Sequence, residues 1–157
     1  MHALHALART LPVDPPVASL VWQAAVLIGE RRALGASPLG ERFIVPILGG
    51  TVWGAGPHAA LQGTVLPGGA DRQLLRADGV KELDALYELQ LDDGTVLTVR
   101  NRVTMDEQVQ PRYARSVVQV SAPAGPWAWL NRRCLVGSLQ SLRPQAQAVL
   151  VSVFSLG

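Results

Sequence analysis

The sequence contains very little cysteine and histidine. Cys134 is the only cysteine, which excludes an intramolecular disulfide and a thiol-rich metal site. Of the three histidines, His2 and His5 lie close to the N-terminus, and only His58 lies in the body of the chain. A metal site with several histidine ligands needs more of them together. The sequence therefore predicts no metal site.

Charge is also scarce, since only 17% of the residues are charged and the formal net charge is +2. Proteins that bind nucleic acid concentrate their cations on one face. Here the adjacent basic pairs are Arg31-Arg32 and Arg132-Arg133, and Lys81 is the only lysine. We therefore expect no nucleic-acid partner. A coding bias explains most of the arginines, and the alternative is that some of them face inward and bind a carboxylate or another anionic group.

No apolar run reaches the length needed to span a bilayer. Residues 1–16 have neither the basic start nor the unbroken apolar segment of a signal peptide. These two absences predict a cytoplasmic protein without a membrane partner.

Nucleotide-binding and hydrolase motifs are missing. The sequence has no P-loop, no G-x-G-x-x-G after a strand and no G-x-S-x-G. The Pro67-Gly68-Gly69 segment is rich in glycine, but it is better interpreted as a strand corner than as a phosphate site. We therefore expect no cofactor, which disfavours redox and group-transfer chemistry.

The residues that are abundant predict an all-β protein. Hydrophobic residues make up 48% of the 157 positions, enough for one domain with a core, while 15 Gly and 11 Pro disfavour long helices. Short strands with turn signals between them are typical of a sandwich or barrel. The clearest hairpin joins residues 83–91 and 95–102 through Asp92-Asp93-Gly94. We expect strands over residues 18–28, 42–48 continued by 51–53, 61–66, 71–77, 83–91, 95–102, 112–121, part of 127–139, and 148–156. Residues 30–40 and 105–111 are expected to be loops, residues 1–17 a flexible lead-in, and residues 18–157 the single domain.

Alternation along the expected strands groups polar residues on common faces. Asp71 and Gln73 share one face of their strand, and so do Arg76 and Asp78. Asn101 lies opposite to Arg100 and Arg102 on its strand, and Trp127, Trp129 and Asn131 are expected to form an aromatic wall that ends in an amide. Polar residues on the inner face of a barrel indicate a cavity. The alternative is that these residues lie on the solvated face and pair across strands.

Several motifs together resemble a known family. The segments are RFIVPILGG, GTVLPGGADRQ, RADG, LDALY, VRN and WAWLN, spread from about residue 20 to the C-terminus. This pattern closely resembles the bacterial and fungal proteins grouped as domain of unknown function family 3237. The resemblance implies a single antiparallel, lipocalin-like β-barrel with a central cavity. Because members of the family occur near enzymes of catabolism and secondary metabolism, it also implies a small hydrophobic organic ligand or substrate.

The resemblance can be carried over residue by residue. The family's motif positions correspond here to Arg42, Gly49, Gly50, Asp71, Gln73, Arg76, Asp78, Asp84, Tyr87, Val99, Asn101, Trp129 and Asn131. The chain departs from the pattern at Arg72, Leu86 and Trp127, and its segment between Asn101 and Trp127 is shorter than in many relatives. A shorter segment would cover the barrel mouth less, so the substrate is expected to differ.

Three hypotheses follow. The first is a cofactor-free enzyme of the lyase or isomerase type that uses acid/base proton transfer on a small carbonyl or carboxylic compound. Its catalytic candidates are Asp71, Asp84, Tyr87 and Arg42, and its ligand-binding candidates are Gln73, Arg76, Asn101, Trp53, Trp129 and Asn131. The second is a non-catalytic barrel that binds a small molecule. The third is a homodimer paired through strand edges, which Pro46 in the strand over 42–48 disfavours.

Overall fold

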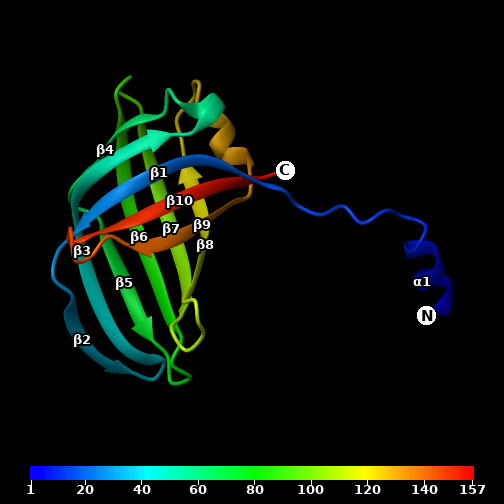
Figure 1. Cartoon of the computed structure of the whole chain (residues 1–157), viewed down its shortest axis with the longest axis horizontal. Coiled ribbons are helices and arrows are strands. Elements are labelled where there is room, and N and C mark those ends of the chain that lie inside the picture. Colours follow the sequence, from blue (N-terminus) through cyan, green and yellow to red (C-terminus); the bar gives the residue numbers. More distant parts are fainter.

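The computed structural model describes all 157 residues and contains ten strands in one sheet (Figure 1). The strands are β1 (Ala18–Ile28), β2 (Arg32–Ser37), β3 (Gly40–Gly54), β4 (Gln62–Val65), β5 (Ala70–Leu75), β6 (Lys81–Leu91), β7 (Val96–Asp106), β8 (Tyr113–Ser121), β9 (Leu135–Ser141) and β10 (Ala148–Leu156). The helices are α1 (His2–Ala8) and two 3-10 helices, η1 (Gly56–His58) and η2 (Ala128–Arg132).

The sheet closes on itself into an antiparallel barrel. The strand order runs β1-β10-β9-β8-β7-β6, and β4 and β5 both lie between β6 and β3. β3 then pairs with β1 and completes the ring, while β2 adds to β3 outside it. The predicted all-β barrel is confirmed.

β3 changes its neighbours halfway along its length. Its first half pairs with β2 and β5, and its second half pairs with β1 and β4. Pro46 is the last residue of β3 that pairs with β5. Its carbonyl accepts a hydrogen bond from the backbone N–H of Gly29, at 2.8 Å, just beyond β1. A proline is tolerated here because the ladder is interrupted at this point.

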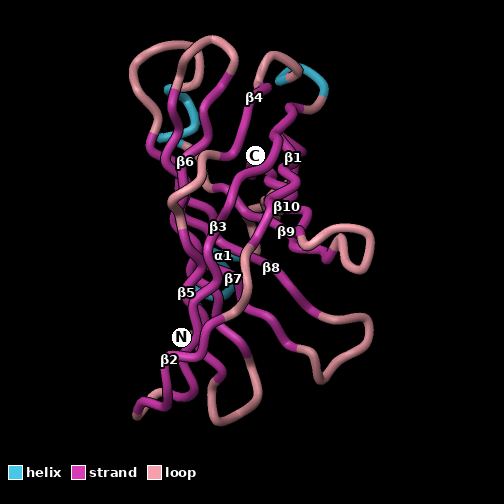
Figure 2. The backbone as a smooth tube through the Cα atoms, turned by 90° about the vertical axis from the view of Figure 1, so that its left-hand side faces the viewer, coloured by secondary structure: helices cyan, strands magenta, loops and turns pink.

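The hydrophobic core fills one end of the barrel. Strand alternation directs a cluster of 21 buried residues inward, and the largest of these side chains include Trp22, Leu89 and Leu97. Both 3-10 helices lie at this end (Figure 2). Leu61 after η1 and Leu130 in η2 are fully buried there and close the barrel. The opposite end is less filled, which leaves space for a cavity.

Apart from shifts at strand ends, such as β7 reaching Asp106 and β5 ending at Leu75, two sequence predictions about the barrel's secondary structure are wrong. Residues 32–37 form β2 rather than a loop, although five of its six residues are exposed, because its backbone pairs with β3. Residues 128–132 form η2 rather than a strand, so the expected aromatic wall does not exist. A 3-10 helix has three residues per turn, and Trp127 and Leu130 are therefore both directed into the core.

Residues 1–17 lie outside the barrel, and α1 extends far from it (Figure 1). No residue of α1 is buried, and the sequence pattern did not predict this helix. That residues 1–17 are flexible stays a prediction. None of the helices has the length and apolarity that crossing a membrane would require.

Candidate functional site

A cavity of about 450 Å³ occupies the less filled end of the barrel. This volume is within the usual range of small-molecule sites. Of its 22 lining residues, 12 are hydrophobic, so an apolar ligand body would fit most of the wall. The polar lining falls into two groups. One lies on the inner faces of β5, β6 and β7, and the other lies at the mouth, where β1 is connected to β2, β7 to β8 and β9 to β10.

Strand register explains the inner polar group. Asp71 on β5 pairs with Ala85 on β6, and Ala85 pairs with Asn101 on β7. All three line the cavity, because residues directly opposite each other across a sheet share a face. The methyl side chain of Ala85 leaves open space between the carboxyl of Asp71 and the amide of Asn101.

The carboxyl of Asp71 is only partly satisfied by hydrogen bonds. Its Oδ2 accepts a hydrogen bond from Nε2 of Gln73 at 2.9 Å, while its Oδ1 is buried without a partner in the protein. Burial raises the pKa of Asp71, and the hydrogen bond from Gln73 opposes this rise. No arginine contributes to the pKa of Asp71. A desolvated carboxylate with a raised pKa is a stronger base than one in water.

Tyr87 lies on the same face of β6, two residues beyond Ala85. Its ring is buried, and its hydroxyl has no hydrogen-bond partner. Burial and the nearby charge of Asp71 both raise the pKa of Tyr87, so the phenol stays protonated and can donate a hydrogen bond. Oδ1 of Asn101 is likewise buried without a partner. The cavity therefore presents one base, one donor and one amide to a ligand.

The raised pKa of Asp71 predicts a pH-dependent stability. From the ordinary aspartate pKa up to its raised folded-state pKa, the folded protein binds more protons than the unfolded chain. The free energy of unfolding therefore falls as pH rises through this window and stays lowered above it. We expect Asp71→Asn to be more stable than the wild type at pH 7, by about 1.4 kcal/mol for each unit by which the pKa is raised. Thermal unfolding from pH 3 to pH 8 measures this difference, which should shrink toward acidic pH.

Asp84→Asn is the matched control, because the pKa of Asp84 is shifted the other way. Hydrogen bonds from Arg100 lower it, so the ionised form of Asp84 stabilises the fold above its ordinary pKa. The pair is exposed and its contribution is small. A gain of stability in Asp84→Asn equal to that in Asp71→Asn would contradict the assignment of the effect to burial.

Three charged candidates from the sequence lie outside the cavity. Asp84 is on the outer face of β6 and accepts two hydrogen bonds from Arg100, at 3.1 and 2.9 Å. Arg42 donates to the carbonyls of Leu34 and Gly35 and so holds β2 on β3. Arg76 forms ion pairs with Asp78 and Glu82. These three side chains therefore have partners within the protein and do not line the cavity.

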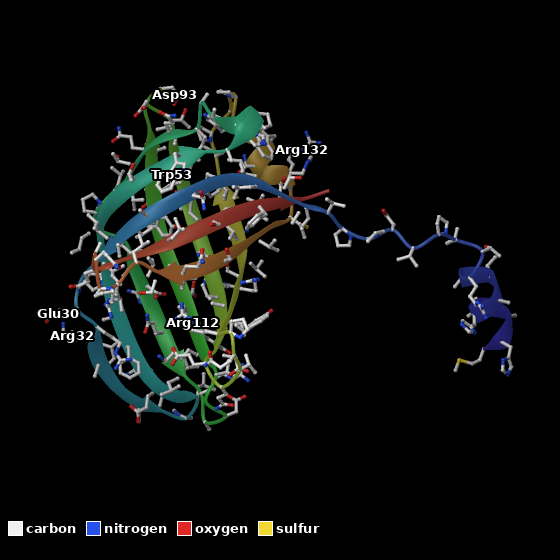
Figure 3. The ribbon with its side chains drawn as sticks, in the orientation of Figure 1. Glu30, Arg32, Trp53, Asp93, Arg112 and Arg132 are labelled. Atoms are coloured by element: carbon white, nitrogen blue, oxygen red, sulfur yellow. The ribbon has the colours of Figure 1, made fainter.

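The remaining sequence candidates outside the cavity are two tryptophans and one amide. Trp53 is exposed on the outer face of β3 (Figure 3). Trp129 stacks on His58 with ring centroids 5.0 Å apart, which joins η2 to η1. Asn131 donates to and accepts from the backbone of Ala122 and so anchors η2. Of the ten candidates, only Asp71, Tyr87, Gln73 and Asn101 line the cavity.

The mouth residues were not among the sequence candidates. They are Arg31, Lys81, Glu107, Arg112 and Arg143. The available signals were the Arg31-Arg32 pair and the uniqueness of Lys81, but neither pattern says that a loop residue faces a cavity. No group of three or more His, Cys, Asp and Glu side chains is arranged to hold a metal ion.

Comparison with known proteins identifies a family and relatives from two bacteria. Residues 16–156 match the family described as "Protein of unknown function (DUF3237)". A UPF0311 protein of Rhodopseudomonas palustris is 33% identical over 132 residues, which cover 75% of this chain and 84% of that protein. A UPF0311 protein of Clostridium acetobutylicum is 36% identical over 104 residues, covering 64% of this chain and 54% of that protein.

Solved structures share the barrel. A conserved protein of unknown function from R. palustris has a TM-score of 0.82 at 29% identity, covering 92% of this chain and 100% of that one. A beta-barrel like protein from Acinetobacter baumannii has a TM-score of 0.78 at 25% identity, and the match covers 93% of this chain and 99% of that one. A protein from Penicillium herquei described as an enzyme has a TM-score of 0.73 at 22% identity, and the match covers 94% of this chain and 98% of that one. At this identity the similarity is one of fold alone.

Proposed function

The chain belongs to the protein family of unknown function DUF3237, and from this premise we propose that it is a small, cofactor-independent enzyme of proton transfer. Its substrate would be a small hydrophobic carbonyl or carboxylic compound held in the barrel cavity. One observation carries the proposal: Oδ1 of Asp71 and the hydroxyl of Tyr87 are both buried, both unpartnered, and on the lining of one cavity. Unpaired buried polar atoms are costly to the fold unless a ligand uses them.

Asp71 would act as the general base. Its ionised carboxylate takes a proton from the carbon next to the substrate carbonyl, and the electrons of that C–H bond form an enolate. The resulting carboxylic acid gives a proton to a second carbon, which moves a double bond along the substrate. In D₂O the acid exchanges its proton with solvent before this return, so the substrate gains deuterium. The step consumes no other reactant. Gln73 holds Oδ2 of the base and leaves Oδ1 free to accept the proton.

Tyr87 would stabilise the enolate oxygen. Its phenol stays protonated and can donate a hydrogen bond where negative charge develops, inside a cavity that is mostly apolar. Asn101, across Ala85 from Asp71, would orient the substrate through its amide. The same base and donor could serve dehydration or cyclisation, which begin with removal of a proton next to a carbonyl. They could also serve aldol-type cleavage, in which the base takes the hydroxyl proton and the breaking C–C bond leaves the enolate.

Deuterium exchange tests this proposal without knowledge of the natural substrate. The protein is incubated in D₂O with a panel of α,β-unsaturated and hydroxy-carbonyl compounds. NMR follows loss of the proton that the carbonyl acidifies, at the α-carbon of the hydroxy-carbonyl compounds and at the γ-carbon of the α,β-unsaturated ones. We expect exchange above the uncatalysed rate for compounds that fit the cavity. Compounds that bind the protein without any exchange would instead establish the alternative, a non-catalytic binding barrel, which the apolar majority of the cavity lining also favours.

Tyr87→Phe should slow this exchange about 10²–10³-fold, because it removes the single phenolic donor to the enolate oxygen. The ring remains, so packing is retained, and binding of the substrate should change much less than the rate. The initial exchange rates at saturating substrate give the comparison. An unchanged rate in the Phe variant would remove Tyr87 from the mechanism.

A further inference from the structure

The mouth of the cavity carries more positive charge than the protein itself neutralises. Lys81 at the start of β6 pairs with Glu107 at 3.2 Å, so these two residues cancel each other. Arg31, Arg112 and Arg143 line the same cavity, and none of them forms an ion pair or donates a side-chain hydrogen bond. Three exposed guanidinium groups therefore remain without an acceptor within the protein.

These three arginines come from three different connections of the barrel. Arg31 follows β1, Arg112 precedes β8, and Arg143 lies between β9 and β10. The guanidinium of Arg31 lies over the ring of Phe43, 4.1 Å from its centroid, which orients it. Arg112 is drawn below β9 and β10, in front of the far wall of the barrel (Figure 3). Charges contributed by separate loops repel each other unless something between them is negative.

Asp71 does not supply that negative charge. Its hydrogen-bond partner is Gln73, and the groups that influence its ionisation include no arginine. Ala85, which pairs with Asp71, is four residues from Lys81 along β6, a distance of about 13 Å. The guanidinium groups and the base thus lie at different depths of one cavity.

We propose that the cavity takes an anionic substrate, with a carboxylate bound by Arg31, Arg112 and Arg143 at the mouth and an apolar body directed toward Asp71 and Tyr87. A guanidinium fork matches a carboxylate in shape and charge, which makes it the group of choice for this task. The inference rests on the proposed function for the role of Asp71 and Tyr87 and adds the substrate class to it. A carboxylate held at the mouth keeps the reacting end of the molecule at the base.

Binding of matched acids and amides tests the proposal. The probes are 3-phenylpropanoate, 5-phenylpentanoate and 7-phenylheptanoate, each compared with its neutral primary amide by isothermal titration calorimetry. In the wild type we expect at least one acid to bind about tenfold more tightly than its amide. The preference should weaken as salt is raised, because exposed charges are screened.

Two double variants distinguish the effect of the arginines at the mouth from the effect of the protein's net charge. Arg112→Gln with Arg143→Gln should abolish the preference for the acid and leave amide affinity within about twofold. Arg102→Gln with Arg132→Gln removes the same charge from the outer face and from the opposite end (Figure 3), and should keep the preference. Thermal unfolding of both variants confirms that they are folded.

A wild type that prefers no acid over its amide would overturn the inference, as would a preference that survives in the mouth variant or is lost equally in the outer one. These outcomes are independent of proton transfer, which deuterium exchange measures. If the protein prefers acids but catalyses no deuterium exchange, it is an anion-binding barrel without the proposed activity. If it catalyses exchange but shows no preference for acids, it is an enzyme for neutral substrates.

Discussion

Asp71→Asn should lower the rate of deuterium exchange about 10²–10⁴-fold, the usual contribution of a positioned general base. Asparagine keeps the shape of the side chain and can still contact Gln73, but it cannot accept a proton from a C–H bond. Asp71 is the only acidic side chain on the inner faces of the strands that line the cavity, because Glu107 belongs to the mouth and pairs with Lys81. No neighbouring carboxylate can therefore take over its task.

Asp84→Asn provides the matched comparison for activity as well as for stability. Asp84 lies one residue from Ala85 on the outer face of β6 and is paired with Arg100. We expect its exchange rate to stay within about threefold of the wild type, since the charge of Asp84 affects the pKa of Asp71 less than burial and the hydrogen bond from Gln73 do. Equal rates in Asp71→Asn and the wild type, or an equal loss in both variants, would refute Asp71 as the base.

The stability of Asp71→Asn distinguishes a loss of catalysis from a loss of folded protein. Asp71→Asn is expected to be more stable than the wild type at neutral pH, so a fall in exchange cannot come from a smaller folded fraction. A catalytic group that costs stability is common at active sites. A variant that is both more stable and inactive would combine the two effects expected of a functional buried carboxylate.

Gly50→Ala should destabilise the barrel by more than about 3 kcal/mol, because two costs add at this residue. The backbone of Gly50 has φ of +141°, a conformation that residues with a side chain rarely adopt. A Cβ at Gly50 would also lie 2.1 Å from the carbonyl oxygen of Ala25 on β1. Gly50 pairs with Val26, so the clash falls on the β1–β3 ladder that closes the barrel.

Gly49→Ala separates the two costs. Gly49 has a similar φ of +152°, but the nearest atom to its added Cβ is the carbonyl oxygen of Val65 at 3.7 Å. We expect Gly49→Ala to cost about 1–3 kcal/mol from the backbone conformation alone. Chemical denaturation of both variants gives the difference, which measures the contact with β1. Equal stability of the two variants would mean that β1 moves aside without cost.

Much of the barrel could be predicted from local sequence, because strand alternation and turn residues act over short distances. The hairpin around Asp92-Asp93-Gly94 is present, and on β6 and β7 the alternation groups residues on the faces that the structure shows, with Tyr87 and Asn101 on the inner one. β2 was missed because its residues are mostly exposed and it is held by backbone pairing to β3. η2 was missed because Trp127 and Leu130 are buried at the spacing of a 3-10 helix rather than a strand.

The sequence by itself determined that the chain is an all-β barrel of this family, that Asp71 shares a face with Gln73, and that Asn101 lies opposite to Arg100. It left open which carboxylate faces the barrel interior, because strand alternation sorts residues into two faces without saying which face is the inner one. The tertiary structure decided this, because the closed sheet curves so that the face with Asp71 lines the cavity and the face with Asp84 lies outside. Only the tertiary structure brought Arg31, Arg112 and Arg143 to one mouth, because they lie in separate connections and meet only when the ring of strands closes.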